Sequence, residues 1–259
     1  MPSGKRAKDQ RKAAPPPPVR STGGAGSHRL SRRALVIGVA VLALVAVGVG
    51  LGVELSGGGR ASGGTNANTA PLSTLGTLIP PGPLGAAGPE TLPIENGPAL
   101  APAASPALGA SVDGIQCGAG EQVAFHIHAR LTIFVDGKSR SVPGGVGIAD
   151  PQTQSTPEGP FVANGSCFSW LHTHAADGVI HIESPVQRVY TLGNFFDIWH
   201  QPLSRTQAGP ANGPVTVLYN GNVWTGNPRD VPLNAHAQIQ LEVGKPLVAP
   251  VHVTNWGGL

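Results

Sequence analysis

Apolar and polar residues alternate from Glu121 onward with the period of two that is typical of a β-strand with one buried face. In residues 123–135 the side chains of Val123, Phe125, Ile127, Leu131, Ile133 and Val135 fall on one face, and those of His126, His128, Arg130 and Thr132 fall on the other. Further short strands are predicted at 168–174, 179–184, 215–224 and 235–243. Asp136–Gly137 and Asn220–Gly221 have the composition of tight hairpin turns.

Residues 193–201 form the one short helix candidate, with Asn194 as its N-cap. Many short strands separated by Gly and Asn turns are typical of all-β folds. We therefore expect residues 114–259 to form a mainly β, extracytoplasmic domain, built as a single sandwich or barrel with one short helix.

The remainder of the chain has a different pattern. Residues 34–53 form an uninterrupted apolar run without charge, and as a helix they would span about 30 Å, the thickness of a bilayer's hydrocarbon core. We predict a single transmembrane helix over residues 34–55, in contact with membrane lipid. Retention as a signal-anchor is favoured over cleavage, because no clear cleavage motif follows. The sequence "SRRALV" resembles the twin-arginine export motif, which leaves the export route open.

Charge predicts the orientation of this helix. Residues 1–33 carry nine Lys or Arg and one acid, whereas residues 34–259 carry eight Lys or Arg and thirteen acids. The basic residues at 1–33 predict a disordered cytoplasmic tail by the positive-inside rule, with the C-terminal domain outside the cytoplasm at the cell membrane. Because the basic charge lies in the tail, nucleic acid is not predicted as a partner.

Residues 56–113 are rich in Gly, Pro and Ala, and all twelve aromatic residues lie between Phe125 and Trp256. Such a segment cannot bury enough apolar surface to offset its own ordering entropy. We therefore expect residues 56–113 to be a disordered linker between the membrane and the domain.

Cys117 and Cys167 are the only cysteines, and both lie in the predicted extracytoplasmic domain. A disulfide is the expected state in an oxidising compartment. A copper thiolate is the alternative, because Cys167 precedes His172 by five residues, but the only methionine is Met1 and no axial Met is at hand.

Histidines are concentrated on the polar faces of the predicted strands. His126 and His128 point the same way, as do His172 and His174, because residues i and i+2 of a strand share a face. A two-residue turn after His174 would pair His174 with His181, and a four-residue turn would pair His172 with His181. Either register keeps His181 and Glu183 on the face of His172 and His174. The site predicted from this pattern comprises His126, His128, His172, His174, His181 and Glu183, with His236 as an additional candidate ligand.

Two resemblances accompany these motifs. Residues 120–128, "GEQVAFHIH", match the first part of the cupin pattern, but the acid that should follow is absent. Residues 117–243 are similar to an uncharacterised group of bacterial membrane-anchored proteins that share "HIHARLTIFVDG", "WLHTHAADGVIHIE", "TLGNFFDIW" and "AHAQIQL". The resemblance implies no known activity.

Three functions are consistent with this sequence. The first is a membrane-anchored domain that binds a divalent transition metal, for which imidazole and carboxylate ligands suit Zn, Cu(II), Fe or Ni. The second is a metalloenzyme of the hydrolase or oxygenase type at the same site, with Glu183 as the candidate base. The third is a metal-free adhesion or assembly domain.

Overall fold

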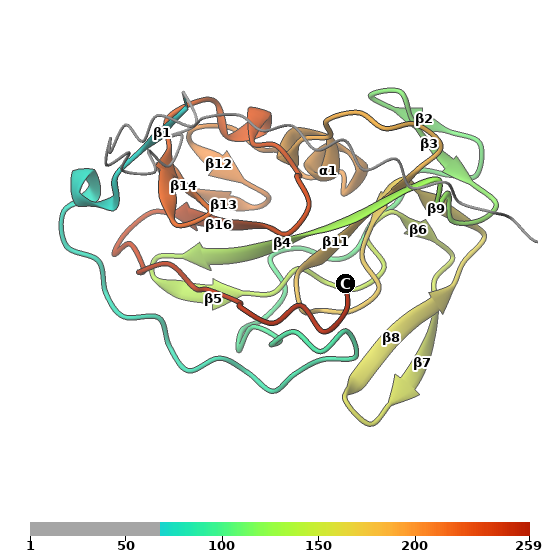
Figure 1. Cartoon of the computed structure of the whole chain (residues 1–259), viewed down its shortest axis with the longest axis horizontal. Helices are drawn as coiled ribbons and strands as arrows, with labels where there is room; N and C mark the ends of the chain where they lie inside the picture. Colours follow the sequence, from blue (N-terminus) through green and yellow to red (C-terminus); the bar gives the residue numbers. More distant parts are fainter. Residues whose placement is uncertain (1–67) are drawn as a thin grey trace, which may run out of the picture. The chain divides into compact units, whose positions relative to one another are not determined.

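The computed structural model describes residues 68–259 (Figure 1). The predicted cytoplasmic tail, the predicted transmembrane helix and the start of the predicted linker lie outside this range. The prediction of a mainly β fold with one short α-helix is confirmed for the described residues. None of the helices in this part of the chain is both long enough and apolar enough to cross a bilayer.

The largest sheet has eight strands, and β4 lies near its middle. The order across the sheet is β1 (Thr69–Ala70), β15 (Asn222–Trp224), β14 (Val215–Tyr219), β16 (Ala237–Val243), β4 (Phe125–Val135), β11 (Val179–Ser184) and β10 (Leu171–His172), and β5 (Lys138–Arg140) pairs with the end of β4. β16 and β4 are parallel, and the other pairs are antiparallel. The turns at Asp136–Gly137 and Asn220–Gly221 join β4 to β5 and β14 to β15, with positive φ at all four residues.

Three smaller sheets complete the described fold. One contains β2 (Ser111–Val112), β3 (Ile115–Gly118), β9 (Cys167–Ser169) and β6 (Ile148–Ala149); the others are the hairpins β7 (Gln152–Thr156) with β8 (Gly159–Asn164), and β12 (Gln207–Ala208) with β13 (Ala211–Asn212). The strands thus form several sheets, and the prediction of a single sandwich or barrel is not confirmed. The predicted disulfide is confirmed, because Cys117 of β3 is bonded to Cys167 of β9.

The alternation along β4 divides the main sheet into two faces. Ala129, Leu131 and Ile133 are fully buried in the main core, together with Ile180 and Ile182 of β11. The histidines of β4 and β11 lie on the opposite face, which is covered by irregular segments of the chain. One face therefore stabilises the fold, and the other carries the candidate site.

The α-helix α1 (Leu192–Ile198) covers the apolar face, and its Phe195 and Phe196 are fully buried. Its N-cap lies three residues earlier than predicted. Thr191 is the N-cap and Asn194 is the third helical residue, and their side chains and backbone amides form a reciprocal capping box. Asn194 is therefore not the N-cap. Two 3₁₀ helices, η1 (Leu72–Leu75) and η2 (Pro228–Asp230), lie in the connections.

The predicted disordered linker differs from the structure over residues 68–113. Leu92 is 0% exposed, and Leu100 and Ala101 are buried within the main core. The backbone of Ile79 hydrogen-bonds the C-terminal segment, through Leu247 O at 2.9 Å and Ala249 N at 2.8 Å. The composition correctly indicates that the segment has no core of its own, but the segment packs onto surfaces that the β domain provides.

The C-terminal segment crosses the polar face of β16 and is held by side chains of that strand. Gln240 Oε1 accepts from Val251 N at 2.8 Å, and Gln238 Oε1 accepts from Val253 N at 2.7 Å. Glu242 Oε1 accepts from Gln240 Nε2 at 2.7 Å and from Val248 N at 3.3 Å. The alternate polar residues of β16 thus serve as hydrogen-bonding partners for a second layer of chain.

Glu242 makes the stability of this layer dependent on pH. Burial raises the pKa of Glu242 to about 7, although the hydrogen bonds from Gln240 and Val248 oppose the shift. The folded state therefore holds a proton that the unfolded chain releases near pH 4.5, and stability falls as pH rises from about 4.5 to about 7. We expect Glu242→Gln, which keeps the acceptor and cannot ionise, to match the parent chain at pH 4 and to be more stable by on the order of 3 kcal/mol at pH 8.

Urea unfolding of both chains across this pH range, with chelator present, measures the difference. Glu158→Gln, which changes an exposed carboxylate, is the matched control and should show no such trend. An equal effect of Glu242→Gln at pH 4 and pH 8 would contradict the prediction.

Candidate metal centre

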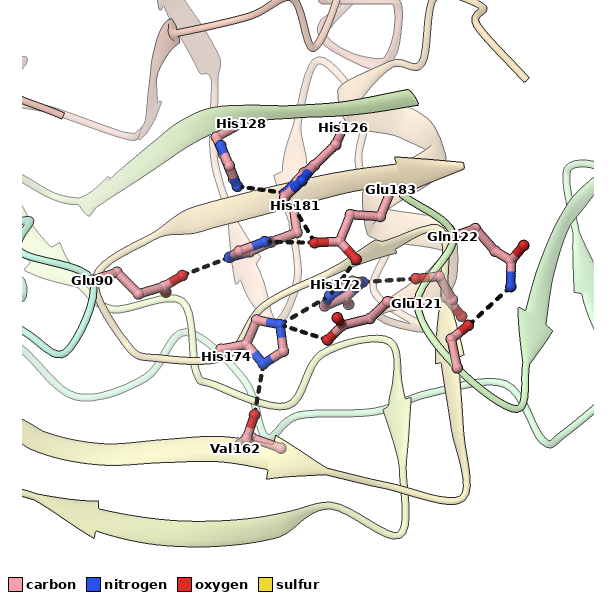
Figure 2. Close-up of polar contacts among 12 residues, drawn as sticks. Glu90, Glu121, Gln122, His126, His128, Val162, His172, His174, His181 and Glu183 are labelled. Atoms are coloured by element: carbon pink, nitrogen blue, oxygen red, sulfur yellow. Dashed lines mark hydrogen bonds and ion pairs between the residues drawn. The ribbon is translucent and has the colours of Figure 1, made fainter. Parts of the chain in front are cut away.

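The polar faces of three neighbouring strands bring the predicted histidines together. In the register of the sheet, His181 of β11 lies opposite His128 of β4 on one side and opposite His172 of β10 on the other. Glu183 lies opposite His126. The pairing of His172 with His181 is the register expected for a four-residue turn at 175–178. All six residues that the histidine pattern predicted as ligands lie in this cluster (Figure 2).

His126 and His128 form the first pair. Their Nε2 atoms are 3.0 Å apart, and His126 Nε2 is also 3.0 Å from Glu183 Oε1. The His126 side chain is 40% exposed, whereas His128 is buried. This pair therefore lies at the solvent-accessible side of the cluster.

His172 and His174 form the second pair, which is fixed by backbone carbonyl groups. His172 Nδ1 is 2.8 Å from Ser169 O, and His174 Nδ1 is 2.6 Å from Val162 O. A carbonyl oxygen only accepts, so each Nδ1 carries the proton and donates it. In the neutral rings both Nε2 atoms are then lone-pair acceptors, and they face each other at 3.1 Å.

This arrangement has the form of a metal-binding half-site. Histidine ligands commonly donate the second ring nitrogen to a carbonyl or carboxylate, which fixes the tautomer that presents a lone pair to the ion. Two nitrogens bound to one tetrahedral ion at 2.0–2.1 Å lie about 3.3 Å apart. Two acceptors at 3.1 Å have no attractive contact with each other, and a cation between them supplies one.

His181 lies between two carboxylates. Its Nδ1 is 3.1 Å from Glu183 Oε1, and its Nε2 is 2.5 Å from Glu90 Oε1. Burial acts to lower the pKa of His181, but the hydrogen bonds to Glu183 and Glu90 outweigh it and raise the pKa to about 9. Without a metal, His181 is therefore an imidazolium that holds the two carboxylates in place.

The other buried histidines are neutral at physiological pH. Burial, reinforced by the charge of His181, lowers the pKa of His128 to about 4 and lowers those of His172 and His174 as well. Burial acts to raise the pKa of Glu183, but its hydrogen bond from His181 and the nearby imidazoles lower it to about 2. Neutral imidazoles and an ionised carboxylate are the forms that bind divalent cations.

Sequence reasoning missed two acids of this site. Glu90 belongs to the segment interpreted as linker, yet it is buried and contacts His181. Glu121 lies in the loop before β4, with its Oε1 3.4 Å from His174 Nε2. One signal was present, since Glu90 and Glu95 are the only acids between residues 56 and 112. Isolated acids in an otherwise nearly uncharged segment indicate specific partners.

Three groups of potential ligands have atoms within 4.8 Å of one another among the described residues. They are His126 with His128 and His181, His172 with His174 and His181, and Glu121 with His172 and Glu183. His236 belongs to none of them. It is exposed, lies just before β16 at positive φ, and stacks on Trp256, so it is not positioned as the additional ligand. Cys167 is bonded to Cys117, so its sulfur is not available as a copper thiolate.

A cavity of about 260 Å³ lies beside the second pair. His174 contributes to its wall, with Ile94, Pro143, Val162 and Ala176 among its other lining residues. Most of this lining is apolar. A small molecule in the cavity would therefore lie next to a candidate ligand histidine.

The fold and the cluster together define a class of protein: a disulfide-bonded β domain whose main sheet carries a histidine and carboxylate cluster under irregular covering segments. Comparison with known proteins adds no closer assignment, because no family model, no curated protein and no solved structure matches the chain. The function is therefore argued from the site itself.

Proposed function

We propose that this protein is a membrane-anchored, extracytoplasmic domain that binds a divalent transition metal through its strand histidines. The observation that carries the proposal is the second pair. Ser169 O and Val162 O fix the protons of His172 and His174 on Nδ1, and the two free Nε2 lone pairs converge at 3.1 Å. Burial lowers the pKa of both rings, which favours a metal ion over a proton as the cation that would join them.

The donor set limits the metal. Imidazole nitrogen with carboxylate oxygen suits Zn, Cu(II), Fe or Ni, whereas Cu(I) prefers thiolate and thioether ligands. The only methionine is Met1, and both cysteines are in the disulfide. We therefore infer that the site binds Zn, Cu(II), Fe or Ni as a divalent ion, and that the protein does not carry Cu(I).

The location is part of the same proposal. The uncharged run at 34–53 after a basic tail supports a single-pass anchor with a cytoplasmic N-terminus. The Cys117–Cys167 disulfide supports an oxidising compartment for the domain. A metal-binding site on this side of the membrane fits uptake, buffering or delivery of an extracytoplasmic ion.

The test uses the full chain, purified in detergent, freed of metal with chelator, loaded with Zn²⁺ and dialysed. We expect the parent chain to retain zinc and to gain about 4 kcal/mol of stability when free zinc is a thousandfold above Kd. A variant with His126, His128, His172 and His174 all changed to Asn should retain none. The matched control changes His200, His236 and His252 to Asn, because all three are exposed and outside the cluster.

Retention of zinc by the four-histidine variant, or no retention by the parent chain, would contradict metal binding at this site. Circular dichroism of the metal-free chains shows whether each variant is folded. A parent chain that binds no divalent ion under these conditions would leave the metal-free adhesion or assembly domain as the function.

A metalloenzyme at the same site is the second candidate, and the cavity beside His174 is the observation that favours it. In this version the cluster histidines would hold an ion that would supply activation of a water molecule, and Glu183 is the candidate base. Turnover of a small substrate by the metal-loaded chain distinguishes catalysis from binding alone.

A further inference from the structure

The cluster contains two separate nitrogen pairs, each with the spacing of two ligands on one ion. The Nε2 atoms are 3.0 Å apart in the first pair and 3.1 Å apart in the second. Two nitrogens on one tetrahedral zinc lie about 3.3 Å apart, so each pair needs little movement to bind an ion. The spacing occurs once within β4 and once in the segment that begins in β10 and continues beyond it to His174.

One ion does not serve both pairs. Among the described residues, no group with ligand atoms within 4.8 Å of one another combines the first pair with the second. His181 is within reach of either pair, so a single ion could take His181 and one pair. If that ion took the first pair, the second pair, whose Nδ1 protons are held by carbonyl groups, would keep its close Nε2 contact without a cation to satisfy it.

Glu183 lies between the pairs and directs one oxygen toward each. Its Oε1 is 3.0 Å from His126 Nε2, and its Oε2 is 4.0 Å from His172 Nε2. Figure 2 shows the two pairs on opposite sides of His181 and Glu183. Glu183 is 3% exposed, and its Oε2 has no hydrogen-bond partner among residues 68–259. A buried carboxylate oxygen without a donor is costly, and a second cation would satisfy it.

We propose that the cluster binds two divalent transition-metal ions, one on each histidine pair, with the Glu183 carboxylate bridging them. This inference rests on the proposed metal-binding function. Glu121, 3.4 Å from His174 Nε2 and grouped with His172 and Glu183, supplies a further oxygen to the ion on the second pair.

His181 acts on the bridge as a positioning residue. Its ring hydrogen-bonds Glu183 Oε1 on one side and Glu90 Oε1 on the other, so Glu90 in the covering segment fixes the orientation of the bridging carboxylate. Two ions that share a carboxylate lie close enough to polarise one small molecule together, as in sites that use two metal ions.

Metal counting on the full chain tests the proposal. With Zn²⁺ alone, we expect two equivalents per chain by titration calorimetry and by elemental analysis after dialysis. The variant His126→Asn/His128→Asn and the variant His172→Asn/His174→Asn should each retain one equivalent. His252→Asn, which changes an exposed histidine outside the cluster, should retain two.

Loading with Cu²⁺ alone adds a measurement that depends on the bridge. Two Cu²⁺ ions joined by one carboxylate couple their spins, so the parent chain should show less paramagnetic resonance intensity than its copper content predicts. Each pair variant should show full intensity for its one ion. Glu183→Gln tests the bridge itself, because a neutral amide is a poor bridging ligand, and any two ions that remain should be uncoupled.

Each alternative result is distinct. If the parent chain binds one equivalent, the two-ion proposal is wrong and the metal-binding function still holds. This conclusion is the same whether one of the two pair variants or both of them fail to bind that ion. Two equivalents with full Cu²⁺ intensity in the parent chain overturn the bridge. No binding by the parent chain overturns the proposed function as well.

Discussion

A chain that begins at residue 114 is expected to be unfolded, whereas a chain that begins at residue 68 is expected to fold. The first boundary is the one that composition indicates, and it removes Leu92 and Leu100, which are buried against the domain. Each fully buried leucine contributes about 1.5–3 kcal/mol. The truncation also removes Glu95, the partner of the buried Arg130. Together these losses approach the whole stability of an ordinary domain, about 5–15 kcal/mol.

Circular dichroism and urea unfolding of the two chains measure the effect. The matched comparison is the chain of residues 68–259, which retains the segment and still lacks the predicted transmembrane helix. A cooperative unfolding transition in residues 114–259, at a denaturant concentration similar to that of the longer chain, would contradict the prediction. The segment would then be an accessory cover rather than part of the fold.

The parts of the structure that follow from local pattern could be predicted. The alternation along β4 correctly places Leu131 and Ile133 in the core and the histidines on the opposite face. The Asp136–Gly137 turn follows from residue types that accept positive φ. The cysteine pairing follows from there being only two cysteines, both in the part of the chain that is predicted to be exported. In each case the residues that interact are close in sequence, or no other pairing is possible.

The packing of residues 68–113 onto the β domain could not be predicted in the same way. Glu90 and His181 are 91 residues apart, and no periodic pattern connects them. The absence of aromatic residues predicts disorder because the segment has no core of its own, but it is ordered by contacts with Val179 and the C-terminal segment. Such docking depends on the shape of a surface that exists only after the sheet has formed.

The candidate site contains residues that local pattern predicts and residues that only the tertiary structure brings in. The i, i+2 spacing predicts that His126 and His128 share a face, and the turn length limits the register of His172 against His181. The carboxylates Glu90 and Glu121 come from irregular segments, where residue spacing carries no directional information. Local pattern therefore predicts the imidazoles, and only the tertiary structure adds the acids that orient them.

Glu95→Ala is expected to destabilise the fold by about 3–5 kcal/mol, the typical cost of removing one partner of a buried ion pair. Arg130 is 2% exposed, and its Nη2 donates to Glu95 Oε1 at 2.8 Å and to Pro93 O at 2.9 Å. Without Glu95 the guanidinium keeps only carbonyl partners, at Pro93 and at Asp177. The remaining charge is then buried without its ion-pair partner, and the nearby Asp177 carboxyl offsets only part of it.

Urea unfolding of a double-mutant cycle separates the contribution of the Glu95–Arg130 ion pair from any general disruption of residues 68–113. Arg130→Met removes the buried charge and fills much of the same volume, so Glu95→Ala/Arg130→Met should be more stable than Glu95→Ala alone. Glu158→Ala, at an exposed carboxylate, is the matched control and should change stability by less than about 0.5 kcal/mol. A loss below about 1 kcal/mol for Glu95→Ala would show that water compensates the guanidinium. In that case the apolar contacts of residues 68–113, chiefly those of Leu92, would hold this segment on the domain. The ion pair would not be required.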